Sequence, residues 1–173
     1  SAMLPPHPPR PAPSAMAVPS RSPESERLND WRLLPSKPDW ARGFADWRPG
    51  EEGARDALDL FADNAVDYGK RRDLPAVEGT SRLSPHLHFG EISPATVWQA
   101  VAGRGEGRES FCRELGWRDY ATGIIARQAD YGQYNGRAAF DDFPWRTDRT
   151  AHAEFKAWTR GETGYPIVDA GMR

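Results

Sequence analysis

The chain has 173 residues, enough for one domain with a buried core, and a formal net charge of -2. That charge neither favours nor excludes a nucleic-acid partner, because only a local basic patch could attract phosphates. The single cysteine, Cys112, excludes an internal disulfide, and no apolar run approaches the ~20 residues that span a bilayer. We therefore expect a cytoplasmic protein that does not cross a membrane.

The first 27 residues differ in composition from the rest. Half of the 16 prolines fall in this stretch, with few large apolar side chains among them. Proline fixes φ and lacks an amide donor, so residues 1–27 are predicted to be extended and disordered. Ser1-Ala2-Met3 resembles a cloning remnant. Residues 28–50 alternate aromatic residues with Pro and Gly, which predicts a linker laid over a domain surface.

Helical periodicity begins at Glu51. Apolar residues recur at helical spacing as far as Tyr68, with acids in the first turn and bases in the last, which predicts an amphipathic helix ended by Pro75. Ser93-Pro94 is typical of a helix start, with a serine N-cap and proline at N1, and the following glycines are predicted to end that helix near residue 103.

A longer helix is predicted from about residue 108 to 128, followed by a loop over 131–149. Thr150 is predicted to cap the next helix, which Gly161 ends, and Pro166 to begin a last one that is still running at Arg173. We therefore expect the parent protein to continue beyond this sequence. No strand pattern is convincing, so the predicted fold is mainly α.

A polar loop over Gly79-Thr80-Ser81-Arg82-Leu83-Ser84 is the first candidate site. Its hydroxyls and amides could bind phosphate oxygens, with Arg82 supplying positive charge or fixing the loop. Most loops of this composition simply cap the next helix, and the residues alone favour that interpretation. The spacing of a nucleotide-binding P-loop is absent.

Four stretches, in chain order, resemble one family. They are Gly79-Thr80-Ser81-Arg82-Leu83-Ser84-Pro85-His86-Leu87-His88-Phe89-Gly90-Glu91-Ile92-Ser93-Pro94, Arg113 to Tyr120, Phe143-Pro144-Trp145, and Trp158 to Arg173. Together they resemble the flavin domain of DNA photolyases and cryptochromes, most of all a class I cyclobutane pyrimidine dimer photolyase. The resemblance implies a multi-helical FAD-binding domain, of which residues 51–173 would form the N-terminal part, preceded by an interdomain linker at 28–50.

The resemblance also implies FAD as the cofactor and assigns roles to single residues. The positions that match FAD contacts are Tyr68, Thr80, Ser81, Arg82, Leu83 and Ser84. Phe111 stands where relatives often have a Trp near the flavin. Trp145 matches the outermost tryptophan of an electron relay, although the loop from 146 to 152 is longer here than in relatives.

On the substrate side, the resemblance assigns DNA contacts to Arg72, Glu114, Trp117 and Arg118. Glu114 and Trp117 are three residues apart, so a helix places them on one face, where they could bind a flipped-out base pair. The residues alone favour other roles: core packing for Trp117 and an ion pair between Glu114 and Arg118. His86 and His88 are expected to be structural, and no metal site is expected.

The implied activity is light-driven repair of cyclobutane pyrimidine dimers in DNA, catalysed by a carbon–carbon lyase that transfers an electron from FAD. Two alternatives stay open: a cryptochrome-type blue-light sensor without repair activity, and an inactive half-domain that binds FAD weakly or not at all. An antenna chromophore would be bound by an N-terminal domain outside this sequence. The residues do not decide the lesion type or the oligomeric state.

Overall fold

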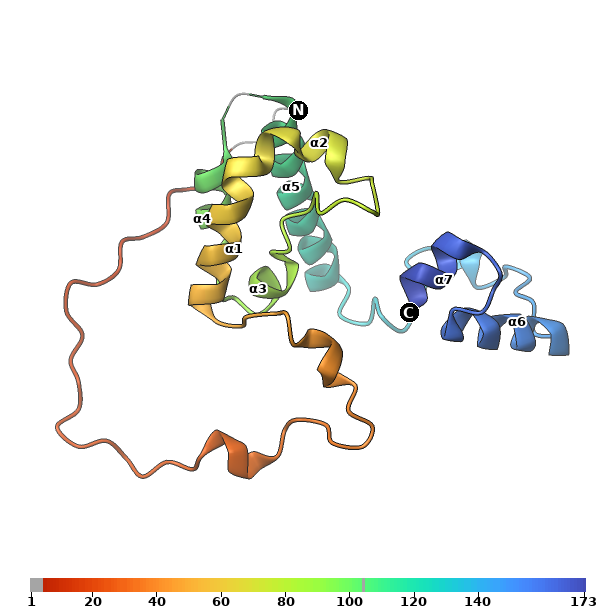
Figure 1. Ribbon diagram of the computed structural model, residues 1–173, viewed down its shortest axis with the longest axis horizontal. Coiled ribbons are helices and arrows are strands. Elements are labelled where there is room, and N and C mark those ends of the chain that lie inside the picture. Colours follow the sequence, from red (N-terminus) through yellow and green to blue (C-terminus); the bar gives the residue numbers. More distant parts are fainter. Residues whose placement is uncertain (1–4, 104) are drawn as a thin grey trace. The chain divides into compact units, whose positions relative to one another are not determined.

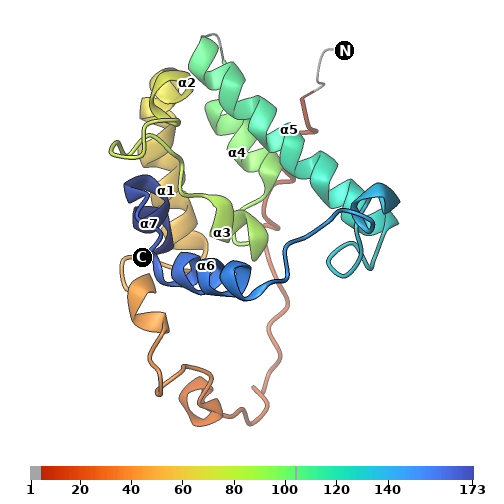
Figure 2. The ribbon, with the colours of Figure 1, turned by 90° about the vertical axis from the view of Figure 1, so that its right-hand side faces the viewer.

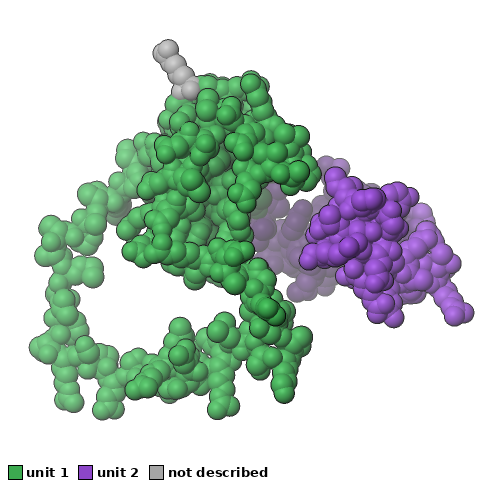
Figure 3. All heavy atoms as spheres, in the orientation of Figure 1, with its two compact units in different colours: residues 1–123 green, residues 124–173 purple. Residues whose placement is uncertain are grey.

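A computed structural model describes residues 5–103 and 105–173. The chain divides into two compact units (Figure 3): unit 1 ends at Gly123, and unit 2 comprises Ile124–Arg173. Every regular element in the described residues is a helix (Figure 1), which confirms the prediction of a mainly α fold. None of these helices is both long and apolar enough to cross a membrane.

The N-terminal part of unit 1, residues 5–50, is largely exposed. Residues 5–27 contain no helix or strand. The segment that follows has only two short 3-10 helices, η1 (Leu28–Trp31) and η2 (Ala41–Phe44), and most of its aromatic side chains face solvent. Its last residues are the exception, because Trp47 and Arg48 contact the helical part of unit 1.

The helical part of unit 1 is built from α1 (Glu51–Asn64), η3 (Ala65–Asp67), α2 (Tyr68–Arg71), α3 (Ser84–His88), α4 (Pro94–Val101) and α5 (Glu106–Arg127), whose last turn reaches unit 2. Helices α1, α4 and α5 lie side by side, as Figures 1 and 2 both show. The buried residues between the helices are Ala54, Leu58, Phe61, Ala65, Leu83, Leu87, Ile92, Val97, Val101, Phe111 and Leu115.

The helix predicted from Glu51 is interrupted, because α1 ends at Asn64 and a 3-10 turn separates it from α2. The interruption lies where α5 comes closest. A Cβ on Gly107 would stand 2.5 Å from the carbonyl oxygen of Ala65 and 2.1 Å from that of Val66. Glycine thus permits backbone contact at this point. The prediction that Gly107 lies among the glycines that end the preceding helix is wrong, since it lies in the first turn of α5.

Side chains fix the helix ends of unit 1. The Ser93 hydroxyl accepts a hydrogen bond from the Thr96 amide at 3.0 Å, which confirms the predicted start of α4. Arg108 of α5 donates to the carbonyl oxygens of Val101 and Ala62, both at 3.0 Å. One guanidinium thus joins α5 to the C-terminal ends of α4 and α1.

Unit 2 contains η4 (Ala138–Phe140), α6 (Arg149–Arg160) and α7 (Pro166–Met172). The N-cap of α6 is Asp148, whose carboxylate accepts from the Ala151 amide at 2.9 Å. The prediction of Thr150 as the cap is therefore wrong: Asp148 adopts the extended backbone of an N-cap, and Thr150 already lies inside the helix. Gly161 ends α6 in the left-handed conformation, with φ of 65°, as predicted.

A buried carboxylate closes the turn between α6 and α7. Asp169 accepts hydrogen bonds from the Thr163 amide, the Thr163 hydroxyl and the Gly164 amide at 2.8, 2.6 and 3.0 Å. These bonds hold the pKa of Asp169 below its usual range, with the Thr163 side chain contributing most. The carboxylate therefore stays ionised, and the turn it fixes belongs to the fourth stretch of the family resemblance.

Candidate functional site

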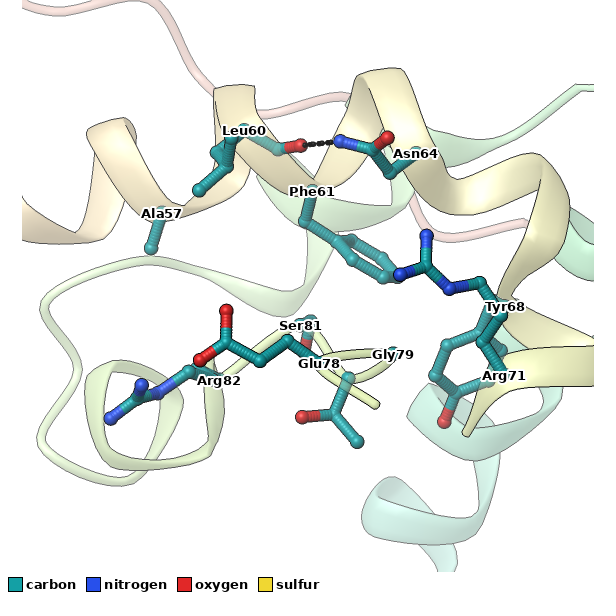
Figure 4. A pocket seen from close by; sticks show the side chains of 11 residues that line it. Ala57, Leu60, Phe61, Asn64, Tyr68, Arg71, Glu78, Gly79, Ser81 and Arg82 are labelled. Carbon is teal, nitrogen blue, oxygen red and sulfur yellow. Dashed lines mark hydrogen bonds between the residues drawn. The ribbon is translucent and has the colours of Figure 1, made fainter. Parts of the chain in front are cut away.

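Unit 1 has a pocket of about 320 Å³ between α1, α2 and the loop that precedes α3 (Figure 4). Its lining residues are Ala57, Leu60, Phe61, Asn64, Tyr68, Arg71, Glu78, Gly79, Thr80, Ser81 and Arg82. One side comes from α1 and is apolar apart from the Asn64 amide. The other side carries two hydroxyls and two charged groups from the loop, together with Arg71 from the end of α2.

The loop reaches the pocket because Gly79 lies directly on Arg71. A Cβ at position 79 would stand 2.6 Å from the carbonyl carbon and the Cβ of Arg71, closer than real contacts allow. Beyond it, the Ser81 hydroxyl accepts a hydrogen bond from the Leu83 amide at 3.3 Å. Glycine and this local bond together hold the Thr80 and Ser81 hydroxyls on the pocket rim.

Arg71 is the basic group that enters the pocket from the helical side. Figure 4 shows its guanidinium turned toward the ring of Phe61. Glu78 lines the same pocket from the loop, so the lining carries both a cation and a carboxylate. Such a pocket suits a ligand with a phosphate at one place and hydroxyl groups at another.

Three aromatic rings form the wall between the pocket and the core. Phe61 packs on Phe111 with ring centroids 4.5 Å apart, and Tyr68 meets each of them edge-on at 5.7 and 5.2 Å. Burial raises the pKa of Tyr68, and the neighbouring positive charge of Arg72 opposes this. The phenol is therefore neutral at physiological pH and can donate a hydrogen bond.

A charged pair lies beside this wall. Arg72 Nη1 donates to Glu114 Oε1 of α5, and the Arg72 guanidinium stands 5.5 Å from the centroid of the Tyr68 ring. The hydrogen bond that Arg72 donates to Glu114 holds the pKa of Arg72 above its usual range. One turn along α5, Trp117 is 63% exposed and meets Tyr120 edge-on at 5.7 Å.

Comparison with known proteins finds proteins to which this chain is similar. A model of the FAD-binding domain of DNA photolyase matches residues 111–173. The chain is 49% identical over 175 aligned positions to a deoxyribodipyrimidine photo-lyase of Agrobacterium fabrum, covering 97% of the chain and 36% of that protein. It is 39% identical to cryptochrome-1 of Sinapis alba, covering 73% of the chain and 27% of the relative.

A solved structure agrees with these matches. The crystal structure of a bacterial class III photolyase from Agrobacterium tumefaciens aligns with a TM-score of 0.83 and 48% identity, covering 92% of this chain and 34% of that one. Over most of its length the chain is thus similar to photolyases and cryptochromes. It spans about a third of the length of these relatives. The matched domain also confirms FAD as the cofactor predicted from the resemblance.

Four of the seven predicted cofactor residues line one pocket: Tyr68 from α2, and Thr80, Ser81 and Arg82 from the loop. The other three lie elsewhere. Leu83 is fully buried in the core, Ser84 is the first residue of α3, and Phe111 is the one ring of the aromatic wall that does not line the pocket. Leu83 and Phe111 therefore shape the pocket through packing.

The position of the Arg82 side chain favours the second of its two predicted roles, fixing the loop. Its guanidinium lies 4.4 Å from the centroid of the Trp47 ring, on the linker. The cation that sequence reasoning did not place in the pocket is Arg71, one of the bases in the last turn of the predicted helix, which suit either a patch for DNA phosphates or a solvated helix end. One signal in the sequence could have indicated Arg71. It precedes the loop, and Gly79 in that loop allows the loop to fold back onto the α2 end.

The structure decides two alternatives on the substrate side. Glu114 pairs with Arg72, whereas Arg118 donates to the Leu87 carbonyl oxygen at 3.0 Å, so the expected ion pair between Glu114 and Arg118 is wrong. Core packing does not describe Trp117, because most of its side chain is exposed. One surface thus carries Arg72 at the end of α2 together with Glu114 and Trp117 in the middle of α5.

Buried His86 has a structural partner. Its Nδ1 lies within hydrogen-bond distance of Glu91, whose carboxylate also accepts from the Gly50 amide. These bonds lower the pKa of Glu91, with His86 contributing most. The contact joins the end of the linker to α3 and to the turn before α4.

Trp145 belongs to unit 2. It is 66% exposed, packs on Phe143 with ring centroids 4.6 Å apart, and lines a shallow hollow of about 710 Å³. Trp158 and Phe155 of α6 line the same hollow. Unit 2 thus brings together two tryptophans from separate stretches of the family resemblance.

Proposed function

We propose that the protein to which this chain belongs is a deoxyribodipyrimidine photo-lyase, which repairs cyclobutane pyrimidine dimers in DNA with light. Unit 1 would supply one wall of its FAD site. The observation that carries this proposal is the pocket itself, because Tyr68, Arg71 and the hydroxyls of Thr80 and Ser81 converge there. Similarity to photo-lyases over nearly the full chain supports it.

The residues present suit a flavin dinucleotide. Thr80 and Ser81 can donate hydrogen bonds to phosphate oxygens, and Arg71 can neutralise their charge. Glu78 can accept hydrogen bonds from sugar or ribityl hydroxyls, as acidic residues do in other dinucleotide sites. When bound, reduced FAD would supply the light-excited electron for opening the dimer, and the chain's own task is to hold and orient it.

The DNA side of the proposal uses the surface formed by Arg72, Glu114, Trp117 and Arg118. Trp117 offers an exposed ring on which a flipped-out base can stack. Glu114 can accept a hydrogen bond from a pyrimidine edge, and its hydrogen bond from Arg72 holds the carboxylate in place. Arg118 already donates from one nitrogen to Leu87, so a DNA contact would use its remaining donors.

Trp145 is proposed as the outermost member of the electron relay. Its exposure supports exchange of electrons with reductants in solution. An antenna chromophore bound by a preceding domain belongs to the same proposal. The similarity to the crystal structure of a bacterial class III photolyase favours class III over the class I form that the sequence motifs suggested.

Repair is tested directly with the purified protein, FAD, a reductant and an oligonucleotide containing one thymine dimer. Blue light should restore the undamaged bases, and no repair should occur in the dark. A Glu114→Ala, Trp117→Ala double variant should retain FAD and lose repair. Bound, photoreducible flavin with undiminished dimers in the wild type would instead establish the sensor alternative, which the similarity to cryptochromes favours.

A further inference from the structure

A contact between the linker and the pocket loop has no assigned role. The Arg82 guanidinium carbon lies 4.4 Å from the centroid of the Trp47 ring. This distance is well within the range of a cation–π interaction. Trp47 is half-buried although most aromatic side chains of the linker are exposed, so this is the point at which the linker meets the loop.

The backbone of Arg82 requires such a restraint. Its φ is 54°, in the left-handed region that residues with a Cβ seldom adopt. Only one other non-glycine residue of the described chain, Arg32, has a positive φ. At Arg82 the chain turns from the pocket-lining hydroxyls of Thr80 and Ser81 into buried Leu83. An unfavourable conformation at this turn persists only when other contacts determine it.

The partner on the linker is itself fixed to α1. Arg48 forms ion pairs with Glu52 and Asp56 of that helix. A Cβ on Gly53 would stand 1.8 Å from the Arg48 carbonyl oxygen, so glycine permits the linker backbone to lie directly on the helix. Trp47 is therefore held from its C-terminal side by contacts that do not involve the loop.

We propose that Trp47 is a positioning residue of the cofactor site. By stacking on Arg82, it holds the loop in the left-handed turn that aims the Thr80 and Ser81 hydroxyls into the pocket. The inference rests on the proposed function, since the cofactor is the flavin dinucleotide named there. It assigns Arg82 to the linker and leaves Arg71 as the cation that faces the ligand phosphates.

Three single variants of the chain separate this role from general stability. Trp47→Leu removes the π-face, Trp47→Phe keeps an aromatic ring, and Trp40→Leu is the matched control. Trp40 belongs to the same linker, is 66% exposed, and packs edge-on against Phe44. FAD affinity is measured by titration from micromolar to millimolar flavin. The Arg82 side-chain protons are followed by NMR, because the Trp47 ring current displaces their resonances.

For Trp47→Leu we expect FAD binding to weaken about fivefold, which is the size of a partly exposed cation–π interaction. Trp47→Phe should recover at least half of the loss on a logarithmic scale, and Trp40→Leu should bind as the wild type does. The ring-current displacement should vanish in Trp47→Leu alone. Wild-type affinity in Trp47→Leu, or an equal loss in Trp40→Leu, would overturn the inference.

The NMR measurement distinguishes this failure from failure of the proposed function. If the wild type bound no FAD while the displacement was present and was lost in Trp47→Leu, the proposed function would fail and the contact would be purely structural. If the wild type bound FAD but showed no displacement, the contact would be refuted and the proposed function would stand.

Discussion

Arg72, at the end of α2, is paired with Glu114 in the middle of α5, and its guanidinium also faces the ring of Tyr68. These residues come from the two sides of the proposed site, since Tyr68 lines the pocket and Glu114 lies on the surface proposed for DNA. The ion pair therefore connects the aromatic wall of the proposed cofactor pocket to the surface proposed for DNA. It also orients a half-exposed carboxylate before any ligand arrives.

Replacing Arg72 by Gln should weaken binding to dimer-containing DNA about tenfold, the size of one hydrogen bond to a charged group. The slope of log affinity against log salt concentration should fall by about one, as when one phosphate contact is lost. Fluorescence anisotropy at several salt concentrations measures both. Arg55→Gln, on exposed α1, is the matched control. An unchanged slope would remove Arg72 from the DNA surface.

Phe111 is expected to act through packing. It is buried against Phe61 and Tyr68, so Phe111→Ala should lower the free energy of unfolding by about 3–5 kcal/mol. Phe89→Ala, at a ring that is 75% exposed, should change it by less than about 0.5 kcal/mol. Urea denaturation monitored by circular dichroism gives both values. Equal effects would show that the aromatic wall is not part of the core.

Local signals predicted much of this fold. Ser93 before Pro94 marks a helix start, and Gly161 marks a helix end, because hydrogen bonds within a few residues decide those positions. The uninterrupted helix from Glu51 to about residue 72 was wrong for the opposite reason. The helix is interrupted where Gly107 of α5 approaches its backbone. Because α3 and α4 lie between them in the sequence, local periodicity could not reveal this contact.

The same contrast between local and long-range signals applies to the candidate site. The hydroxyls of the loop could be predicted because the family motif is continuous in sequence. The partners of Arg82 and Glu114 could not, since Trp47 and Arg72 are far from them along the chain and helical spacing suggested Arg118 instead. Arg71 was missed because only the folding of the loop onto its backbone places it at the pocket.

Glu91 predicts how the stability of unit 1 depends on pH. Its folded pKa is lowered by His86 and the Gly50 amide, so its contribution is full above the unfolded pKa of about 4.3 and is lost as pH falls through the folded value. Glu91→Gln should therefore lower the Tm by a few degrees at pH 7. At pH 3 the difference should be much smaller. A constant difference between these pH values would contradict this linkage.

Arg71 provides the sharpest test of how the pocket recognises its ligand. Its guanidinium is the cation turned into the pocket, so Arg71→Gln should weaken FAD binding about tenfold or more, the size of a charge-assisted hydrogen bond to phosphate. Riboflavin lacks phosphate, and its affinity should change little. Lys70→Gln is the matched control, since Lys70 adjoins Arg71 on α2 and does not line the pocket. Equal losses for FAD and riboflavin would mean that Arg71 supports the pocket wall without contacting the diphosphate.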